Sequence, residues 1–317
     1  MARAFNHKHI LGIDHLSAKE LTLLLETSDR FKSLVGPPPI RKVPFLRNIL
    51  VVMAFFEPST RTRLSFETAA KRLTADTMSF TASTSSLVKG ETLLDTCKNL
   101  EAMQPSVIIM RHKSSGAPHF VAENTGISVI NAGDGYHEHP SQALLDLYTM
   151  REHKKEFNGL KVAILGDIAH SRVAHSNIIG LSKLGADVHL AGPATMIPKD
   201  VEKMGNVTVH RDIRDAVNQA EVVMLLRIQL ERMDKTLFPS NREYFRFFGM
   251  DRDVLKLARK NHILMHPGPI NRGVELAHEL ADGPSNVILE QVTNGVVVRM
   301  AMLYLVLGGS LEGEAVQ

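Results

Sequence analysis

The stretch ILVVMAFFEPSTRTRLSFETAAKRL, residues 49–73, predicts a buried strand that leads directly into a helix. Residues 49–56 form an apolar run rich in β-branched and aromatic side chains, which is typical of a strand. Ser59 then stands where a helix N-cap is expected. The core face of that helix would carry apolar residues at the spacing i, i+3, i+4 and i+7, namely Phe66, Ala69, Ala70 and Leu73. A strand followed by a helix is the repeating unit of a parallel α/β sheet.

The same alternation of β-rich runs and helical patterns continues along nearly the whole chain. Nine candidate strands lie at residues 49–56, 77–82, 106–111, 128–133, 160–167, 186–193, 206–211, 221–227 and 262–267. This number exceeds one sheet of the usual size of about 4–6 strands, so we expect two sheets. The predicted fold class is therefore α/β with two domains, each a mainly parallel sheet flanked by helices.

Two helical segments are expected to connect these domains. HPSQALLDLYTMREHKKEF, residues 139–157, has Pro140 at a first helical position and is predicted to bridge them. Residues 284–309 are apolar on much of the helix circumference, so this C-terminal helix must be buried and is expected to pack back on the first domain. We assign residues 1–148 to the first domain, 149–290 to the second and 291–317 to the returning helix.

The composition excludes several classes of protein. No window of the 317 residues approaches the roughly 18 uninterrupted apolar residues that cross a bilayer. The net charge of +3 is spread without a Lys/Arg block, which argues against nucleic acid as the main partner. The N-terminal residues show no secretory signal pattern, and the single Cys97 has a helical spacing that predicts a core position. We expect a cytoplasmic protein.

PSTRTR, residues 58–63, places two cations at the start of the predicted helix. The helix dipole and the unpaired N–H groups favour an anion there. Hydroxyls, backbone N–H groups and the Arg61 guanidinium could together bind phosphate. The alternative is a solvated face on which Arg61 and Arg63 pair with carboxylates. The candidates for that pairing are Glu57, Glu67 and Asp76.

Polar residues at other strand ends suggest a larger site, because ligands of open α/β sheets gather at the carboxyl ends of the strands. These residues are Arg111, His139 and Gln142 in the first half and Arg172, Arg227, Gln229, Gly268 and Pro269 in the second. Arg172 and Arg227 could hold carboxylates bidentately or form ordinary ion pairs. Residues 227–249 lack a clear secondary-structure pattern and are predicted to be a long substrate loop.

The sequence does not favour a metal or a nucleotide cofactor. YHEHP, residues 136–140, contains His137 and His139, but no third and fourth zinc ligands follow at a recognisable spacing. No glycine-rich Walker or dinucleotide-binding pattern occurs. We therefore expect neither a metal nor a cofactor.

Six ordered motifs resemble those of a known family. They are FFEPSTRTRLSFE, SLVKGETLLDT, MRH, NAGDGYHEHPSQALLDLYT, GDIAHSRVAHSN and LLRIQLER. Their order and approximate spacing resemble those of the aspartate carbamoyltransferase catalytic chain, and the match runs from about residue 8 to 308. The Ser-Thr-Arg-Thr-Arg and His-Pro-x-Gln elements are shared with ornithine carbamoyltransferases. LLRIQLER and the lack of a His-Cys-Leu-Pro element favour the aspartate branch, and HPGPINRG differs from the His-Pro-Leu-Pro form of some relatives.

The resemblance implies transfer of a carbamoyl group from carbamoyl phosphate to L-aspartate, giving N-carbamoyl-L-aspartate and phosphate in pyrimidine synthesis. By motif position, the phosphate would be held by Ser59, Thr60, Arg61 and Thr62. The carbonyl oxygen would be held by Thr62, Arg111 and His139, and Gln142 would hold the carbamoyl nitrogen. The aspartate carboxylates would be held by Arg172, Arg227 and Gln229, beside a substrate loop that contains Gly268 and Pro269. Arg61 would also stabilise the leaving phosphate.

The resemblance further implies a homotrimer with shared active sites. A serine and a lysine of the 81–91 loop would reach the neighbouring subunit's site, and by motif position these are Lys89 and either Ser86 or Ser85, with Ser86 preferred. The trimer could join a larger assembly with regulatory chains or dihydroorotase.

The resemblance also assigns a partner to Glu57, which would pair with Arg172 and Arg232 and favour a closed form of the enzyme. Two alternatives to the aspartate reaction stay open. One is a carbamoyltransferase for another acceptor such as ornithine, and the other is a catalytically silent phosphate-binding scaffold.

Overall fold

The computed structural model describes residues 5–81, 90–228 and 240–309, and contains the nine predicted strands in two parallel sheets. The first sheet has the order β2-β1-β3-β4 and is formed by β1 (Leu50–Phe55), β2 (Asp76–Thr81), β3 (Val107–His112) and β4 (Ser128–Asp134). The second has the order β7-β6-β5-β8-β9 and is formed by β5 (Lys161–Leu165), β6 (Asp187–Ala191), β7 (Val207–His210), β8 (Val222–Leu225) and β9 (Ile263–Met265). The predicted fold class is confirmed.

The chain forms two compact units, one of Met1–Tyr148 with Val292–Gln317 and the other of Thr149–Gln291. The first boundary falls within helix α5 (Pro140–Lys154), and the second falls within α10 (Ile288–Val306). The later part of α10 packs in the first unit, as predicted. There Lys32 Nζ donates to Asn294 Oδ1 at 2.6 Å, and the rings of Phe31 and Tyr304 lie 5.6 Å apart.

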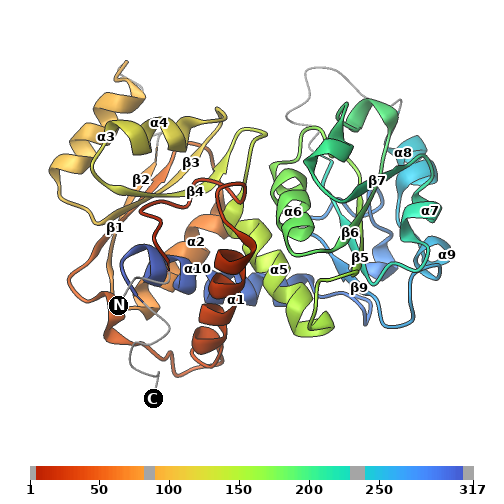
Figure 1. Ribbon diagram of the computed structural model, residues 1–317, viewed down its shortest axis with the longest axis horizontal. Coiled ribbons are helices and arrows are strands. Elements are labelled where there is room, and N and C mark those ends of the chain that lie inside the picture. Colours follow the sequence, from red (N-terminus) through yellow and green to blue (C-terminus); the bar gives the residue numbers. More distant parts are fainter. Residues whose placement is uncertain (1–4, 82–89, 229–239, 310–317) are drawn as a thin grey trace. The chain divides into compact units, whose positions relative to one another are not determined.

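Helices cover both faces of the first sheet (Figure 1). The helices of this unit, besides parts of α5 and α10, are α1 (Ala18–Lys32), α2 (Thr60–Arg72), α3 (Leu93–Ala102) and α4 (Ala117–Asn124). Cys97 in α3 and Val121 in α4 pack with Ala54 of β1 and Met110 of β3 in one apolar cluster, whereas α2 lies on the opposite face. Cys97 is a core residue, as predicted, and burial raises the pKa of its thiol to about 12.

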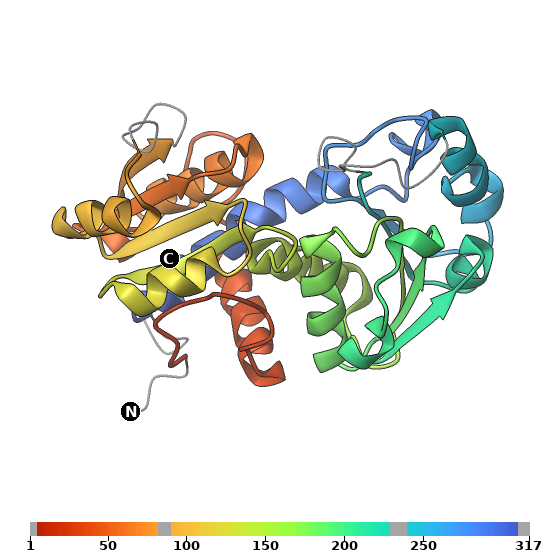
Figure 2. The same ribbon diagram turned by 90° about the horizontal axis from the view of Figure 1, so that it is seen from above.

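The second unit is also layered. Its further helices are α6 (Arg172–Lys183), α7 (Ile213–Val217), α8 (Asn241–Phe248) and α9 (Arg252–Leu255). Figure 2 shows α6 on one side of the sheet and α7, α8 and α9 on the other. Short 3-10 helices in the two units lie at Pro44–Leu46, Ala194–Met196, Val201–Met204 and His278–Leu280.

The prediction that residues 227–249 form one long loop is wrong at its C-terminal end. Residues 229–239 lie outside the described ranges, but α8 occupies Asn241–Phe248. Ser240 caps this helix, because its Oγ accepts a hydrogen bond from Glu243 N at 3.2 Å. Tyr244 of the same helix is buried in an apolar cluster with Met196 and Ile228.

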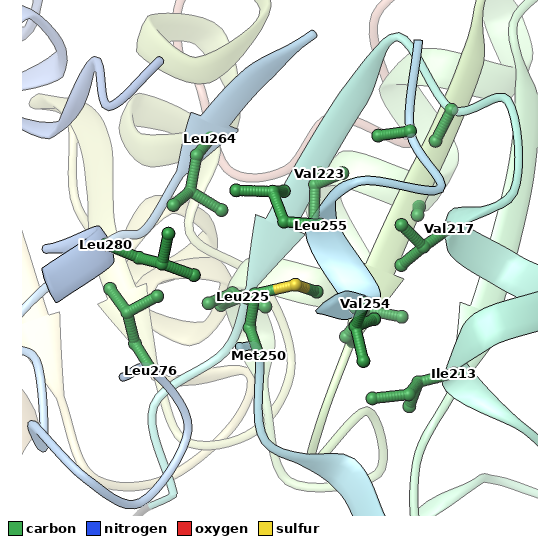
Figure 3. Close-up of a cluster of buried hydrophobic side chains, with 14 of the residues drawn as sticks. Ile213, Val217, Val223, Leu225, Met250, Val254, Leu255, Leu264, Leu276 and Leu280 are labelled. Carbon is green, nitrogen blue, oxygen red and sulfur yellow. The ribbon is translucent and has the colours of Figure 1, made fainter. Parts of the chain in front are cut away.

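One hydrophobic core cluster of the second unit lies between the sheet and the α7–α9 side (Figure 3). Val223, Leu225 and Leu264 of the strands pack there with Val217 of α7 and Leu255 of α9. Among the described residues, no helix has both the length and the apolar character that a bilayer crossing requires.

This core predicts different costs for two leucine truncations. Leu264 in β9 has 0% of its surface exposed, whereas Leu289 at the start of α10 is 83% exposed. Leu264→Ala should lower the free energy of unfolding by about 2–5 kcal/mol, because it leaves a cavity. Leu289→Ala should change it by less than about 0.5 kcal/mol. Urea unfolding followed by circular dichroism measures both, and equal losses would contradict this packing.

Candidate active site

The N-terminus of α2 is the first candidate anion site. Ser59 has the extended backbone of an N-cap (φ −160°), as predicted, but its side chain makes no capping hydrogen bond. The Ser59 hydroxyl is therefore not committed to the helix and can bind a ligand. The first turn, which includes Arg61 and the buried Thr62, contains no acidic residue. The helix dipole and Arg61 thus add up to a positive local charge.

Carboxylates near α2 are engaged by other cations. Glu57 accepts a hydrogen bond from Arg111 Nη2 at 3.0 Å, and Glu67 accepts one from Lys71 Nζ at 2.5 Å. Arg61 is exposed and has no ion-pair partner in the described part of the chain. The solvated-face alternative predicted such pairing for Arg61, and none is found in the described residues. Phosphate binding at this helix start stays a prediction.

Arg111, near the end of β3, is a buried cation at the same sheet edge. Its register partner in β1 is Phe55, the last residue before the turn into α2. The guanidinium donates to the Ala132 carbonyl at 3.2 Å as well as to Glu57. Arg111 Nη1 also lies 3.4 Å from His139 Nε2. The structure therefore brings Arg111 and His139 together, as the resemblance implied.

His139 and Gln142 lie at the start of α5, which follows β4. Both side chains are buried. Gln142 Nε2 donates to Asp146 Oδ1 at 2.9 Å, which leaves Oε1 as the atom that can accept a hydrogen bond from a ligand. Ser141 Oγ lies 3.4 Å from His139 Nδ1. The first unit thus offers N–H groups, guanidinium groups, an imidazole and an amide oxygen, which suits a phosphate joined to a carbonyl.

In the second unit, the adjacent ends of β5 and β8 carry two arginines. Leu165 and Leu225 are register partners, and Leu226 N donates to Leu165 O at 2.9 Å. Arg172 is the first residue of α6 and is buried, while Arg227 follows β8 and is half-buried. Two guanidinium groups at one sheet edge are suited to a ligand with two carboxylates.

The loop after β9 is anchored by a buried histidine. His266 Nδ1 accepts a hydrogen bond from Gly268 N at 2.8 Å, and His266 Nε2 lies 3.2 Å from Glu275 Oε1. Gly268 has a φ of 64°, a left-handed conformation that favours glycine, and precedes Pro269 in a cis peptide. Gly268 therefore fits the backbone of this loop.

Several predicted residues are not described by the structure. Ser85, Ser86, Lys89, Gln229 and Arg232 lie outside the described ranges. The pairing of Glu57 with Arg172 and Arg232 stays a prediction, and within its own unit Glu57 contacts Arg111.

Sequence reasoning missed Ser141 and Asp146. Asp146 lies four residues after Gln142, so the helical i, i+4 rule could have identified it as the partner of that amide. Ser141 lies between two predicted site residues, but no spacing rule indicates a contact with His139.

One group of possible metal ligands lies elsewhere in the described part of the first unit. His119, Asp134 and His137 have ligand atoms within 4.8 Å of one another. The sequence did not suggest this group, because His119 comes from α4. Asp134 Oδ2 already accepts a hydrogen bond from Gly116 N at 2.7 Å and lies 3.1 Å from His137 Nδ1. The hydrogen bond with Asp134 raises the pKa of His137, so these two side chains already stabilise each other.

Comparisons with known proteins agree with this geometry. Residues 8–152 match the carbamoyl-P binding domain of aspartate/ornithine carbamoyltransferases, and residues 158–306 match their Asp/Orn binding domain. The aspartate carbamoyltransferase catalytic subunit of Syntrophotalea carbinolica is 61% identical over 98% of this chain and 99% of its own length.

Solved structures share the fold. The ornithine carbamoyltransferase of Pyrococcus furiosus is 29% identical, with a TM-score of 0.85 over 98% of this chain and 99% of its own. The aspartate transcarbamoylase of Trypanosoma cruzi, in complex with carbamoyl aspartate and phosphate, is 26% identical, with a TM-score of 0.84 over 97% of both chains. This chain belongs to the aspartate/ornithine carbamoyltransferase family.

Proposed function

We propose that this chain transfers the carbamoyl group of carbamoyl phosphate to the amine of L-aspartate, in de novo pyrimidine biosynthesis. The products are N-carbamoyl-L-aspartate and phosphate. The observation that carries the proposal is the carboxyl edge of the first sheet, which holds both the Arg61 helix start and the buried Arg111 and His139. The Syntrophotalea relative bears the name of this activity.

Residues 1–148 would bind carbamoyl phosphate. The phosphate lies at the N-terminus of α2, where it accepts hydrogen bonds from backbone N–H groups and from the hydroxyls of Ser59, Thr60 and Thr62. Arg61 pairs with the phosphate oxygens and stabilises the charge that grows on them as the phosphate leaves.

The carbonyl end of the substrate would lie against Arg111 and His139. These two side chains and Thr62 donate to the carbonyl oxygen, which becomes an oxyanion when the amine attacks. Gln142 accepts a hydrogen bond from the carbamoyl nitrogen through Oε1, because its Nε2 is held by Asp146. The neutral amine attacks the carbonyl carbon and the new C–N bond forms. The C–O bond to phosphate then breaks, and the phosphate leaves with the electron pair and takes up the proton that the amine nitrogen loses. Positioning and charge stabilisation suffice for these steps.

Residues 149–290 would bind the acceptor. Arg172, Arg227 and Gln229 hold the α- and β-carboxylates of aspartate, beside the loop that contains Gly268 and Pro269. Ornithine has one carboxylate and a cationic side chain, so a second guanidinium would repel it. The paired arginines at the β5 and β8 ends thus favour aspartate.

We also infer a cytoplasmic homotrimer with shared active sites. Ser86 and Lys89 of one subunit would complete the carbamoyl phosphate site of its neighbour. A larger assembly with regulatory chains or dihydroorotase would keep this trimer as its catalytic unit.

The acceptor preference can be measured directly. Purified protein given carbamoyl phosphate should release phosphate with L-aspartate and not with L-ornithine, because two carboxylates match two arginines. Colorimetric phosphate release with each amino acid, corrected for spontaneous hydrolysis, gives the rates. A preference for ornithine would overturn the acceptor assignment, and no turnover with either would favour the silent scaffold.

Substitution of Arg61 tests the phosphate site. Arg61→Ala should lower kcat by on the order of 10² or more, as removal of a preorganised transition-state donor does. Arg61→Lys should lose less, because it keeps the charge but not the bidentate geometry. Lys71→Ala is the matched control, since this cation lies at the other end of α2 and pairs with Glu67. Steady-state kinetics that show equal, small losses for Arg61→Ala and Lys71→Ala would restore the solvated-face alternative.

Hybrid trimers test the shared site. Inactive Lys89→Ala and Arg61→Ala chains, mixed equally, dissociated and reassembled, should recover about a quarter of wild-type activity, because three of four random trimers are mixed and each has one intact site in three. Each variant reassembled alone is the control. Failure to recover activity despite hybrid trimers seen by native mass spectrometry would place Arg61 and Lys89 in the same chain's site.

A further inference from the structure

Arg299 is a buried guanidinium in an apolar part of α10. It is 3% exposed, and its neighbours Val298 and Met300 are also buried. Burial lowers its pKa to about 10, despite the opposing influence of Asp146. A methionine or leucine could pack at this position without loss of hydration, so stability alone does not call for arginine here.

The surroundings of Arg299 accommodate its guanidinium group. Nη1 donates to Ser65 Oγ at 3.0 Å, and Nη2 donates to Ser141 Oγ at 3.3 Å. Cζ lies 5.0 Å from the centre of the Phe66 ring, within cation–π range. A Cβ at Gly295, one turn earlier, would come within 2.4 Å of Nη1. Glycine at this position therefore makes room for the guanidinium.

One hydrogen bond and one electrostatic interaction lead from Arg299 to the carbamoyl end of the site. Ser141 Oγ accepts from Arg299, and the same oxygen lies 3.4 Å from His139 Nδ1. Asp146 is fully buried and accepts from Gln142 Nε2, and Arg299 supplies a compensating positive charge to this carboxylate. Arg299 thus acts on Ser141 and Asp146. These residues are the partners of His139 and Gln142, the two side chains that face the carbamoyl group in the proposed function.

We propose that Arg299 is a positioning residue for the carbamoyl end of the active site. It fixes the Ser141 hydroxyl, which holds the His139 imidazole in the orientation that meets the carbonyl oxygen. It also stabilises the Asp146 carboxylate, which directs Gln142 Oε1 toward the carbamoyl nitrogen. This inference rests on the proposed function, and it assigns no role to Arg299 at the phosphate end.

The two serines provide a matched pair of variants. Ser65→Ala and Ser141→Ala each remove one hydroxyl that accepts from Arg299, at similar distances. Only Ser141 also contacts His139. If Arg299 merely held helices together, the two variants would behave alike. If it positions the carbamoyl end, Ser141→Ala should resemble Arg299→Met, and Ser65→Ala should resemble the wild type.

The test compares two ligands by calorimetry. Phosphonoacetamide, a stable analogue of carbamoyl phosphate, occupies both ends of the site, whereas inorganic phosphate occupies only the phosphate end. The affinity for phosphonoacetamide, divided by the affinity for phosphate, should fall about tenfold in Arg299→Met and Ser141→Ala, as loss of one well-placed hydrogen bond predicts. In Ser65→Ala this ratio should stay within about twofold of the wild-type value. In the kinetic assay, kcat should fall in the first two variants while KM for aspartate changes little.

The outcomes are distinct. If wild-type protein binds neither ligand, the proposed function fails. If it binds both, but Ser141→Ala leaves the affinity ratio unchanged, the positioning role is wrong. Equal losses in Ser65→Ala and Ser141→Ala would show that Arg299 acts only through packing. Should Arg299→Met not fold, Ser141→Ala with Ser65→Ala still decides the question.

Discussion

The carboxyl edge of a parallel sheet is the constraint on which this site depends. All strands of the first sheet end at that edge, so β1, β3 and β4 deliver the start of α2, Arg111 and the start of α5 to one place. The second sheet repeats the arrangement with α6 and Arg227. Residues that are far apart in the sequence thus become neighbours without any special loop. The chemistry at the edge is set by which polar residue follows each strand.

The first sheet edge carries two arginine side chains whose charges are stabilised in different ways. Arg111 is buried, so its guanidinium needs partners, and Glu57 together with the Ala132 carbonyl supplies them. Arg61 lies at the surface, where hydration supports its charge. In the proposed function, an arriving phosphate pairs with Arg61 and the helix N-terminus, while the existing partners of Arg111 keep that side chain beside His139. Such preorganisation is what transition-state stabilisation requires.

Most of the fold could be predicted from the sequence, because β-branched runs and helical spacing are local signals. The strand at residues 49–56 and the buried face of α2, including Phe66, follow from spacing alone. Helix α8 was missed because its one strong start signal, Ser240, follows a segment without periodicity. Ser59 is the N-cap of α2, but its hydroxyl makes no capping hydrogen bond. This could not be predicted, because the local sequence does not determine the orientation of a hydroxyl group. Contacts between distant elements, such as Glu57 with Arg111, are not encoded in any spacing.

The same limit explains why Arg299 was not anticipated. In the sequence, Arg299 is one cation in an apolar helix. The two serines to which its guanidinium donates come from α2 and α5. An apolar residue could replace it at little cost in packing, but it could not fix the Ser141 hydroxyl or balance the Asp146 charge. Gly295 on the same helix has no side chain to pack, which leaves space for the guanidinium. The returning C-terminal helix therefore does more than close the first unit, because it places a fixed charge behind the side chains that we propose to contact the substrate.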